Sequence, residues 1–308
     1  MNLEIAPRVR SKRRSLSFDK LAPYIYIMPA GLFLAVIMGY PILFTVLMSF
    51  QQYTLAELVS KQAQFVGLVN YLDVLKNPEF QVTLTHSLVF TFVSIFFQFT
   101  IGLGLAILFS KSFPASNVMR GLLLSGWQIP SVVTGTIFLW LFNLDYGLVN
   151  FILTSLQLIQ EPIGWVIQAD TALITVIIVN IWLGIPFNTI MLSAGITGLS
   201  EDVFEAATVD GANNWQKLIY ITIPMLRSSI LAVLMLGFIY TLRVFDVIWI
   251  MTKGGPGNTT EVLPTFAYRL SFISFNFGQS AAVSIMILAI LLVAAILYLK
   301  FAIQKETV

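Results

Sequence analysis

The chain has 308 residues, of which 57% are hydrophobic and only 10% carry a charge. Soluble domains carry about a quarter charged residues, so this composition excludes an ordinary soluble enzyme and indicates an integral membrane protein. The chain has no Cys and a single His, His86, which excludes disulfides, thiolate metal sites and paired imidazole ligands. A net charge of +2 is too small to favour nucleic acid as a partner.

Six apolar stretches are long enough to cross a bilayer, because a spanning helix needs about 20 apolar residues. These stretches do not show the alternation of apolar and polar residues that is typical of a membrane barrel strand. They therefore predict an all-α membrane protein with six transmembrane helices. A basic arm, 1–23, precedes the transmembrane domain, 24–308. The predicted spans are 24–50, 87–109, 119–142, 171–193, 228–250 and 279–301.

The distribution of Lys and Arg predicts the orientation, because cytoplasmic loops carry an excess of these residues. With the N-terminus inside, twelve Lys and Arg residues fall on the cytoplasmic side and four on the other side. Both termini are therefore expected in the cytoplasm. A cleaved signal peptide is the alternative for the basic start, but the apolar run after Lys20 is about 27 residues long and exceeds a signal core of 7–15 residues.

Two connecting loops predict structure of their own. On the outer side, the apolar stretch 147–159 is too short to span and predicts a helix in the membrane interface. On the cytoplasmic side, the loop 197–227 predicts a helix that begins at Ser200 and ends near Gly211, with Asn213 as the cap of a second short helix. On spacing alone, this loop is either an amphipathic helix on the bilayer surface or an element that docks into a partner.

The residues of the cytoplasmic loop resemble a known motif. Glu205-Ala206-Ala207, then Asp210-Gly211-Ala212 and Ile221-x-Ile223-Pro224, are similar to the EAA loop of binding-protein-dependent ABC importer permeases. Leu218, Ile223 and Arg227 depart from the residues that are more usual in that family. Further segments resemble its sugar-transporter (MalF/UgpA-like) branch, namely 40–50, 65–71, 127–130, 140–150, 182–187, 245–246 and 251–262.

This resemblance implies a type I ABC importer permease (MetI-like) fold in a bacterial-type cytoplasmic (inner) membrane. It implies that the coupling helix that docks on an ATPase contains Glu205, Ala206, Ala207, Asp210 and Gly211. The implied partners are a second homologous permease subunit, two ATPase subunits and an extracytoplasmic solute-binding protein. No Lys follows a Gly, so the phosphate-binding sequence GxxxxGK[ST] is missing from this chain. The expectation is therefore no cofactor on this chain, with ATP and Mg²⁺ on the partner ATPase.

Polar residues inside spans are costly and are functional candidates, although each one alone is more often a hydrogen-bond partner for a neighbouring helix. Arg243 and Asp246, three residues apart, are expected to pair on one helix face, either near the outer interface or beside a polar cavity. Gln98 and Thr134 raise the same question. The candidates for the substrate pathway are Trp127, Ser131, Asn180, Asn188, Tyr240, Arg243, Asp246 and Gln279.

The leading functional hypothesis is the permease of an ATP-driven importer for a carbohydrate, a mono- or oligosaccharide. A neutral sugar is favoured because Arg243 is expected to be offset by Asp246, and the other basic residues of the predicted spans, Arg120 and Lys300, lie at span ends. The alternatives are import of a sugar-phosphate ester, a polyol or an acidic saccharide. A self-sufficient secondary transporter would show two similar halves, and no repeated motif is evident. An intramembrane enzyme would need a nucleophile and a base or metal ligands within the spans.

Overall fold

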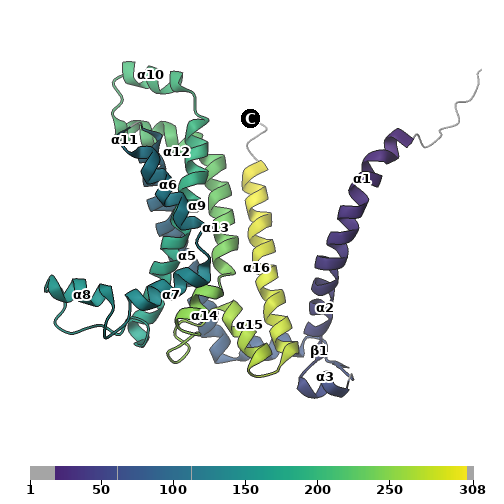
Figure 1. Ribbon diagram of the computed structural model, residues 1–308. Helices are drawn as coiled ribbons and strands as arrows, with labels where there is room; N and C mark the ends of the chain where they lie inside the picture. The colour runs from purple at the N-terminus through teal and green to yellow at the C-terminus, as the bar shows by residue number, and fades with distance from the viewer. Residues whose placement is uncertain (1–17, 61, 112, 304–308) are drawn as a thin grey trace, which may run out of the picture. The chain divides into compact units, whose positions relative to one another are not determined.

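A computed structural model describes residues 18–60, 62–111 and 113–303 (Figure 1). Most of the predicted basic arm, residues 1–17, lies outside the described residues. The described chain is helical apart from one two-stranded antiparallel sheet. It divides into two units, one that ends at Leu47 and one that begins at Met48.

The first unit contains the first predicted span. Helix α1 (Phe18–Leu34) continues through a π-helical turn η1 (Ala35–Gly39) into α2 (Tyr40–Ser49). The stretch Ala22–Ser49 is long and apolar enough to cross a membrane, which confirms the prediction. The wide turn lies just before Pro41, which has no N–H to donate to the carbonyl of Ile37 and disfavours a regular α-helical turn there.

Four further spans of the second unit match the prediction. They are α5 (Pro78–Ser110), α9 (Ala169–Thr197), α13 (Arg227–Leu242) continued by α14 (Asp246–Met251), and α16 (Phe277–Ile303). Helix α5 begins nine residues before the predicted Ser87. Asn77 caps it, accepting a hydrogen bond from the backbone N–H of Glu79 at 2.9 Å, and Pro78 occupies the first helical position, where its missing N–H costs nothing.

The third predicted span, 119–142, is wrong as a single continuous helix. The structure has α6 (Ser116–Trp127) and α7 (Ser131–Leu141), bent by 100° at the break between them. Pro130 explains the break, because its ring disfavours the helical conformation at Ile129 and its nitrogen donates no hydrogen bond. Hydropathy alone does not reveal this bend, since both halves are apolar.

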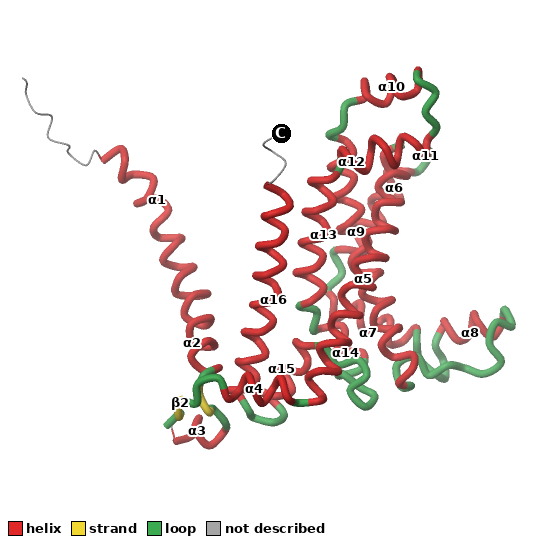
Figure 2. The backbone as a smooth tube through the Cα atoms, turned by 180° about the vertical axis from the view of Figure 1, so that it is seen from behind, coloured by secondary structure: helices red, strands yellow, loops and turns green. Residues whose placement is uncertain are grey.

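Shorter elements gather at the two ends of the second unit. Helices α10, α11 and α12 lie at one end, and α4, α8, α14 and α15 lie at the other (Figures 1 and 2). The elements are β1 (Gln51–Gln52), α3 (Leu55–Ser60), β2 (Gln64–Phe65), α4 (Val69–Lys76), α8 (Leu148–Ser155), α10 (Glu201–Val209), α11 (Asn214–Lys217), the π-helical η2 (Leu218–Thr222), α12 (Ile223–Met225) and α15 (Leu263–Phe272).

The predicted helix in 147–159 is confirmed over the residues of α8; its position in the membrane interface stays a prediction. One amide anchors this segment. The Asn150 side chain, 4% exposed, donates to the carbonyl of Ile163 at 2.9 Å and accepts from the Ile163 N–H at 3.1 Å and the Trp165 indole N–H at 2.8 Å. These bonds hold the loop that follows α8 against α8 itself.

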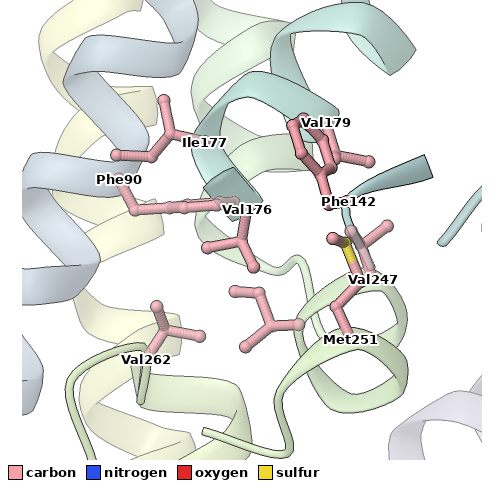
Figure 3. Packing of buried hydrophobic residues seen from close by; sticks show 9 residues of the cluster. Phe90, Phe142, Val176, Ile177, Val179, Val247, Met251 and Val262 are labelled. Atoms are coloured by element: carbon pink, nitrogen blue, oxygen red, sulfur yellow. The ribbon is translucent and has the colours of Figure 1, made fainter. Parts of the chain in front are cut away.

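The largest apolar core lies where α5, α9 and α14 meet. Figure 3 shows Phe90, Val176, Val247 and their neighbours in this cluster, all of them buried. Helices α5 and α9 also approach closely at glycines, because a Cβ on Gly102 would lie 2.6 Å from the Cβ of Asn188. Small residues allow such close approach of helices in membranes. This crossing forms one wall of the cavity described next.

Candidate functional site

A cavity of about 700 Å³ lies between α5, α9 and α13, and is closed on one side by the broken segments α6–α7 and α13–α14. Near the middle of α5 and α9, Gln98 donates from Nε2 to the backbone carbonyl of Asn180 at 2.8 Å. The residues that line the cavity are Gln98, Trp127, Ile129, Ser131, Asn180, Leu183, Gly184, Phe187, Asn188, Gly237, Tyr240, Thr241, Arg243, Val244, Phe245, Asp246 and Val247.

The structure brings seven of the eight candidate residues into this one cavity. The exception is Gln279, which lies in the first turn of α16, where its backbone N–H donates to Asn276 Oδ1 at 3.1 Å. Gln98, singled out only as a polar residue within a span, belongs to the lining as well. The arrangement itself does not test the role of these residues in transport, which stays a prediction.

The expected pairing of Arg243 with Asp246 is wrong. Helix α13 ends at Leu242 and α14 begins at Asp246, so the chain leaves the helical path between them and the spacing rule for one helix face no longer applies. Asp246 instead accepts a hydrogen bond from the hydroxyl of Ser131 at 2.9 Å. Arg243 is exposed in the cavity lining, and among the described residues it forms no ion pair.

The cavity combines hydrogen-bonding groups with aromatic faces. The rings of Trp127, Phe187 and Tyr240 form one wall, with centroid separations of 6.1 Å and 5.6 Å between successive rings. Asn180 is 4% exposed, and its Nδ2 has no hydrogen-bond partner. Leaving a buried amide unpaired is unfavourable, and this amide belongs to a side chain that lines the cavity. A wall of this kind suits a ligand with both hydroxyl groups and apolar ring faces.

The loop 197–227, which is predicted to be cytoplasmic, contains the short helices α10 and α11, followed by η2 and α12. Helix α10 ends at Val209 with Asp210 as its C-cap, and Gly211 follows with a φ of +81°, which residues with a Cβ rarely adopt. Asn213 caps α11 through a reciprocal pair of bonds with Gln216, at 2.9 Å and 2.8 Å, as predicted. Ser200 occupies the predicted cap position of α10 but makes no capping bond with its side chain.

The residues proposed for coupling are mostly accessible on this loop. Glu205, Ala206, Asp210 and Gly211 are exposed, whereas Ala207 is buried. Beside them, a shallow pocket of about 290 Å³ is lined by Asp210, Gly211, Ala212, Gln216, Tyr220 and Ile221. The structure therefore presents a free surface at the predicted coupling helix. Its contact with an ATPase stays a prediction.

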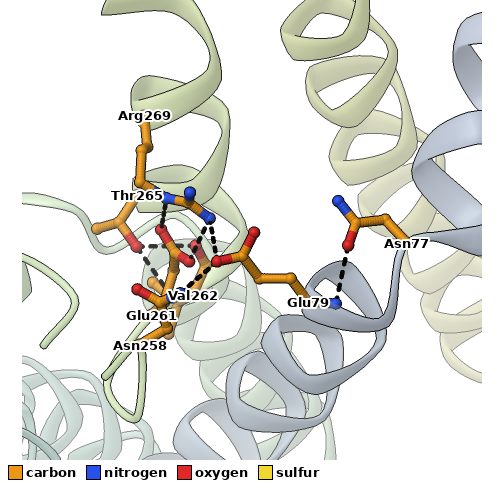
Figure 4. Close-up of polar contacts among 7 residues, drawn as sticks. All are labelled: Asn77, Glu79, Asn258, Glu261, Val262, Thr265 and Arg269. Carbon is orange, nitrogen blue, oxygen red and sulfur yellow. Dashed lines mark hydrogen bonds and ion pairs between the residues drawn. The ribbon is translucent and has the colours of Figure 1, made fainter. Parts of the chain in front are cut away.

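Sequence reasoning missed a charged network at the opposite end of the unit (Figure 4). Arg269 of α15 donates to both carboxylate oxygens of Glu261, at 2.8 Å and 2.9 Å, and contacts Glu79 of α5 at 2.8 Å. Asn258 also donates to Glu79. The sequence signal that could have indicated this network is the presence of oppositely charged residues beside two apolar spans. That signal does not indicate which of these residues form contacts.

Glu261 is the most deeply buried residue of the three charged residues in this network. Glu261 is 2% exposed, and this burial raises the pKa of its carboxyl above the ordinary value, while the hydrogen bonds from Arg269 oppose the rise. The same hydrogen bonds raise the pKa of Arg269. Because both partners are held in fixed geometry, the network fastens the 252–262 loop and α15 to the start of α5.

Comparisons with known proteins agree with this fold. The family model "Binding-protein-dependent transport system inner membrane component" matches residues 98–303. The diacetylchitobiose uptake system permease protein DasB of Streptomyces coelicolor is 30% identical over 93% of this chain and 88% of its own length. The trehalose/maltose transport system permease protein MalF of Thermococcus litoralis is 33% identical over 77% of this chain and 79% of its own.

A solved structure shows the same fold. A chain from the crystal structure of a bacterial ABC transporter involved in the import of the acidic polysaccharide alginate superposes with a TM-score of 0.82, covers 94% of this chain and 99% of its own, and is 19% identical. The expected importer permease fold is thereby confirmed. With its apolar spans and the match over two-thirds of its length, this chain belongs to the family of binding-protein-dependent transport system inner membrane components.

Proposed function

We propose that this chain is the permease subunit of an ATP-driven importer for a carbohydrate, and that its cavity forms half of the translocation pathway. The observation that carries the proposal is the meeting of seven candidate residues in one cavity of mixed polar and aromatic lining. Two relatives, 30% and 33% identical over the aligned residues, are named for diacetylchitobiose uptake and for trehalose and maltose transport. A disaccharide offers the hydroxyl groups and apolar ring faces that this lining complements.

The proposed assembly contains a second permease subunit, two ATPase subunits and an extracytoplasmic solute-binding protein in the lipid bilayer, and involves no nucleic acid. ATP and Mg²⁺ are assigned to the ATPases, and no cofactor to this chain. Both termini and α10 are placed in the cytoplasm, which the twelve-to-four distribution of Lys and Arg supports. Closure of the ATPases would then move the docked α10 as a rigid element and rock the spans between two states.

The first prediction tests the cavity. Replacing Asn180 with Leu keeps the branching of the side chain but removes the unpaired donor, so uptake of the carried sugar should fall about 3- to 10-fold, the size of one or two lost hydrogen bonds. The measurement is uptake of maltose, trehalose and diacetylchitobiose by the reconstituted complex with its own binding protein. Thr100→Val is the matched control, because Thr100 is exposed on α5 outside the cavity. Uptake that Asn180→Leu leaves unchanged would argue against this cavity as the pathway.

One observation favours a second cargo class. Because Arg243 is not offset by a direct pair with Asp246, it offers a cation to an acidic saccharide or a phosphoester. The lining nevertheless holds one cation and one anion, so its formal charge is balanced. We therefore retain a neutral saccharide as the cargo. In the same uptake assay, Arg243→Gln should change transport of the neutral disaccharides by less than about twofold, whereas an anionic cargo would lose about tenfold or more with its charge-assisted hydrogen bonds.

The next prediction concerns coupling to ATP hydrolysis. Glu205→Lys reverses an exposed charge on α10, and Gly211→Asp places a side chain at a φ of +81° in the turn that ends this helix. Either change should abolish most transport and loosen the ATPase while the permease remains in the membrane. The measurement is uptake together with co-purification of the ATPase. Glu201→Lys, which reverses a charge in the first turn of the same helix, is the comparison variant. Full transport by both coupling variants would exclude α10 as the coupling element.

A further inference from the structure

Four aromatic side chains form a continuous column that begins in the cavity wall. The ring of Phe245 lies 5.5 Å from Trp249 and 5.1 Å from Tyr268, Trp249 lies 4.5 Å from Tyr268, and Tyr268 lies 4.7 Å from Phe272. Phe245 lines the cavity, whereas Phe272, at the far end of α15, is 62% exposed. The column therefore connects the cavity with an exposed position at the end of the unit that carries α14 and α15.

The column differs from the aromatic rings that merely anchor a helix at a membrane interface. Anchoring Trp and Tyr rings lie at the two membrane interfaces, whereas this column of four rings in mutual contact begins in the lining of a cavity that contains Arg243, Asp246 and Ser131. Within the described residues, neither the Tyr268 hydroxyl nor the Trp249 indole N–H has a hydrogen-bond partner, and neither atom is fully buried. Acyl chains would leave both polar atoms unpaired, whereas a polyhydroxylated ligand would supply partners for them.

The surrounding contacts hold the column in a fixed arrangement. Arg269, next to Tyr268 in α15, is held by Glu261 and Glu79, and the hydroxyl groups of Thr252 and Thr260 are 2.6 Å apart at the base of the loop between α14 and α15. Rigid aromatic faces bind at a low cost in conformational entropy. The column is thus preorganised for a ligand that stacks on ring faces.

From this geometry we infer that Phe245, Trp249, Tyr268 and Phe272 form a saccharide path between the exposed end of α15 and the cavity. The C–H face of a pyranose stacks on the ring faces that the neighbouring rings leave uncovered, and the Trp249 and Tyr268 polar atoms hydrogen-bond to its hydroxyl groups. Neighbouring rings allow the sugar to pass from one face to the next without complete loss of contact. This inference rests on the proposed carbohydrate function and extends it beyond the cavity.

The test replaces ring faces by apolar side chains in the reconstituted complex with its binding protein. Trp249→Leu and Phe272→Leu keep an apolar surface, so they should be tolerated if the rings face lipid. If the rings guide a saccharide, each variant should lower uptake of maltose, trehalose or diacetylchitobiose per ATP hydrolysed by about 3- to 10-fold, the effect of one lost ring contact. Trp249→Phe, which keeps an aromatic face, should recover most of the loss.

Trp140→Leu is the matched control, because Trp140 is 56% exposed and pairs with Tyr146 outside the column. Loss of uptake in the two column variants, with normal uptake for Trp140→Leu and Trp249→Phe, supports the path. Normal uptake in the column variants, while Asn180→Leu impairs it, overturns the path and leaves the proposed function intact. A wild-type complex that, with its binding protein present, imports neither these disaccharides nor any other mono- or oligosaccharide of a test panel overturns the proposed function and the path together.

Discussion

Arg269→Ala is expected to destabilise the folded chain by about 3 kcal/mol, near the lower end of the range for breaking a buried ion pair. The reason is the surroundings of its partner, because Glu261 is 2% exposed and would lose both of its charge-assisted hydrogen bonds. Arg269 itself is 26% exposed, which places the effect at the lower end. Thermal unfolding of the purified complex in nanodiscs, followed by tryptophan fluorescence, measures the loss.

A second variant separates the unpaired charge from lost packing. Arg269 also lies over the ring of Phe266, with its guanidinium carbon 5.1 Å from the ring centroid, so truncation removes packing as well as charge. The double variant Arg269→Met with Glu261→Met replaces both charges by apolar groups, and it should recover at least half of the stability lost in Arg269→Ala. Equal destabilisation of both variants would show that packing, and not the buried carboxylate, accounts for the loss.

The pH dependence of Arg269→Ala has a definite sign. Burial already raises the pKa of Glu261, and removal of Arg269 raises it further. Between the unfolded and folded pKa values, the folded state then holds more protons than the unfolded state, so stability falls as pH rises through that window. The difference in stability between wild type and Arg269→Ala should therefore be smaller at pH 5 than at pH 8.

Hydropathy predicted most of the fold because the bilayer imposes length and apolar character on each span. Five of the six predicted spans match long apolar helices. The sixth contains a bend of 100° that depends on the local geometry around Pro130. The position of the bend depends on the backbone dihedral angles beside this proline, and hydropathy carries no information about those angles. The same limitation explains the wrong prediction for Arg243 and Asp246, since that prediction assumed an unbroken helix.

The cavity was largely predictable from the sequence, because the cost of polar groups in a membrane places them where they have partners. Eight candidate residues of four predicted spans were chosen one at a time, and the fold brings seven of them to one cavity. The network of Glu79, Glu261 and Arg269 was not predictable in this way. Glu79 precedes Glu261 by more than 180 positions in the sequence, and only the packing of α5 against α15 brings the two carboxylates to one guanidinium.

Gly102→Ala is expected to disturb the crossing of α5 and α9, and with it the cavity wall. The added Cβ would lie 2.6 Å from the Cβ of Asn188 and 3.2 Å from the backbone nitrogen of Thr189, so the two helices must separate by several tenths of an ångström. Overpacking of this kind costs about 1–3 kcal/mol, and only about 1 kcal/mol is regained from the higher helix propensity of Ala. Uptake should fall as well, because Asn188 lines the cavity.

Gly104→Ala on the same helix provides the matched control and the opposite sign. Its Cβ would have no neighbour within 4 Å, so the variant should be neutral or stabilising by up to about 1 kcal/mol through helix propensity alone. Thermal unfolding and disaccharide uptake, measured for both variants in the same complex, check the comparison. If Gly102→Ala were as stable and as active as Gly104→Ala, the helices would tolerate the added methyl group without a shift of the cavity wall. The close approach of α5 and α9 at Asn188 would then not be required for the cavity.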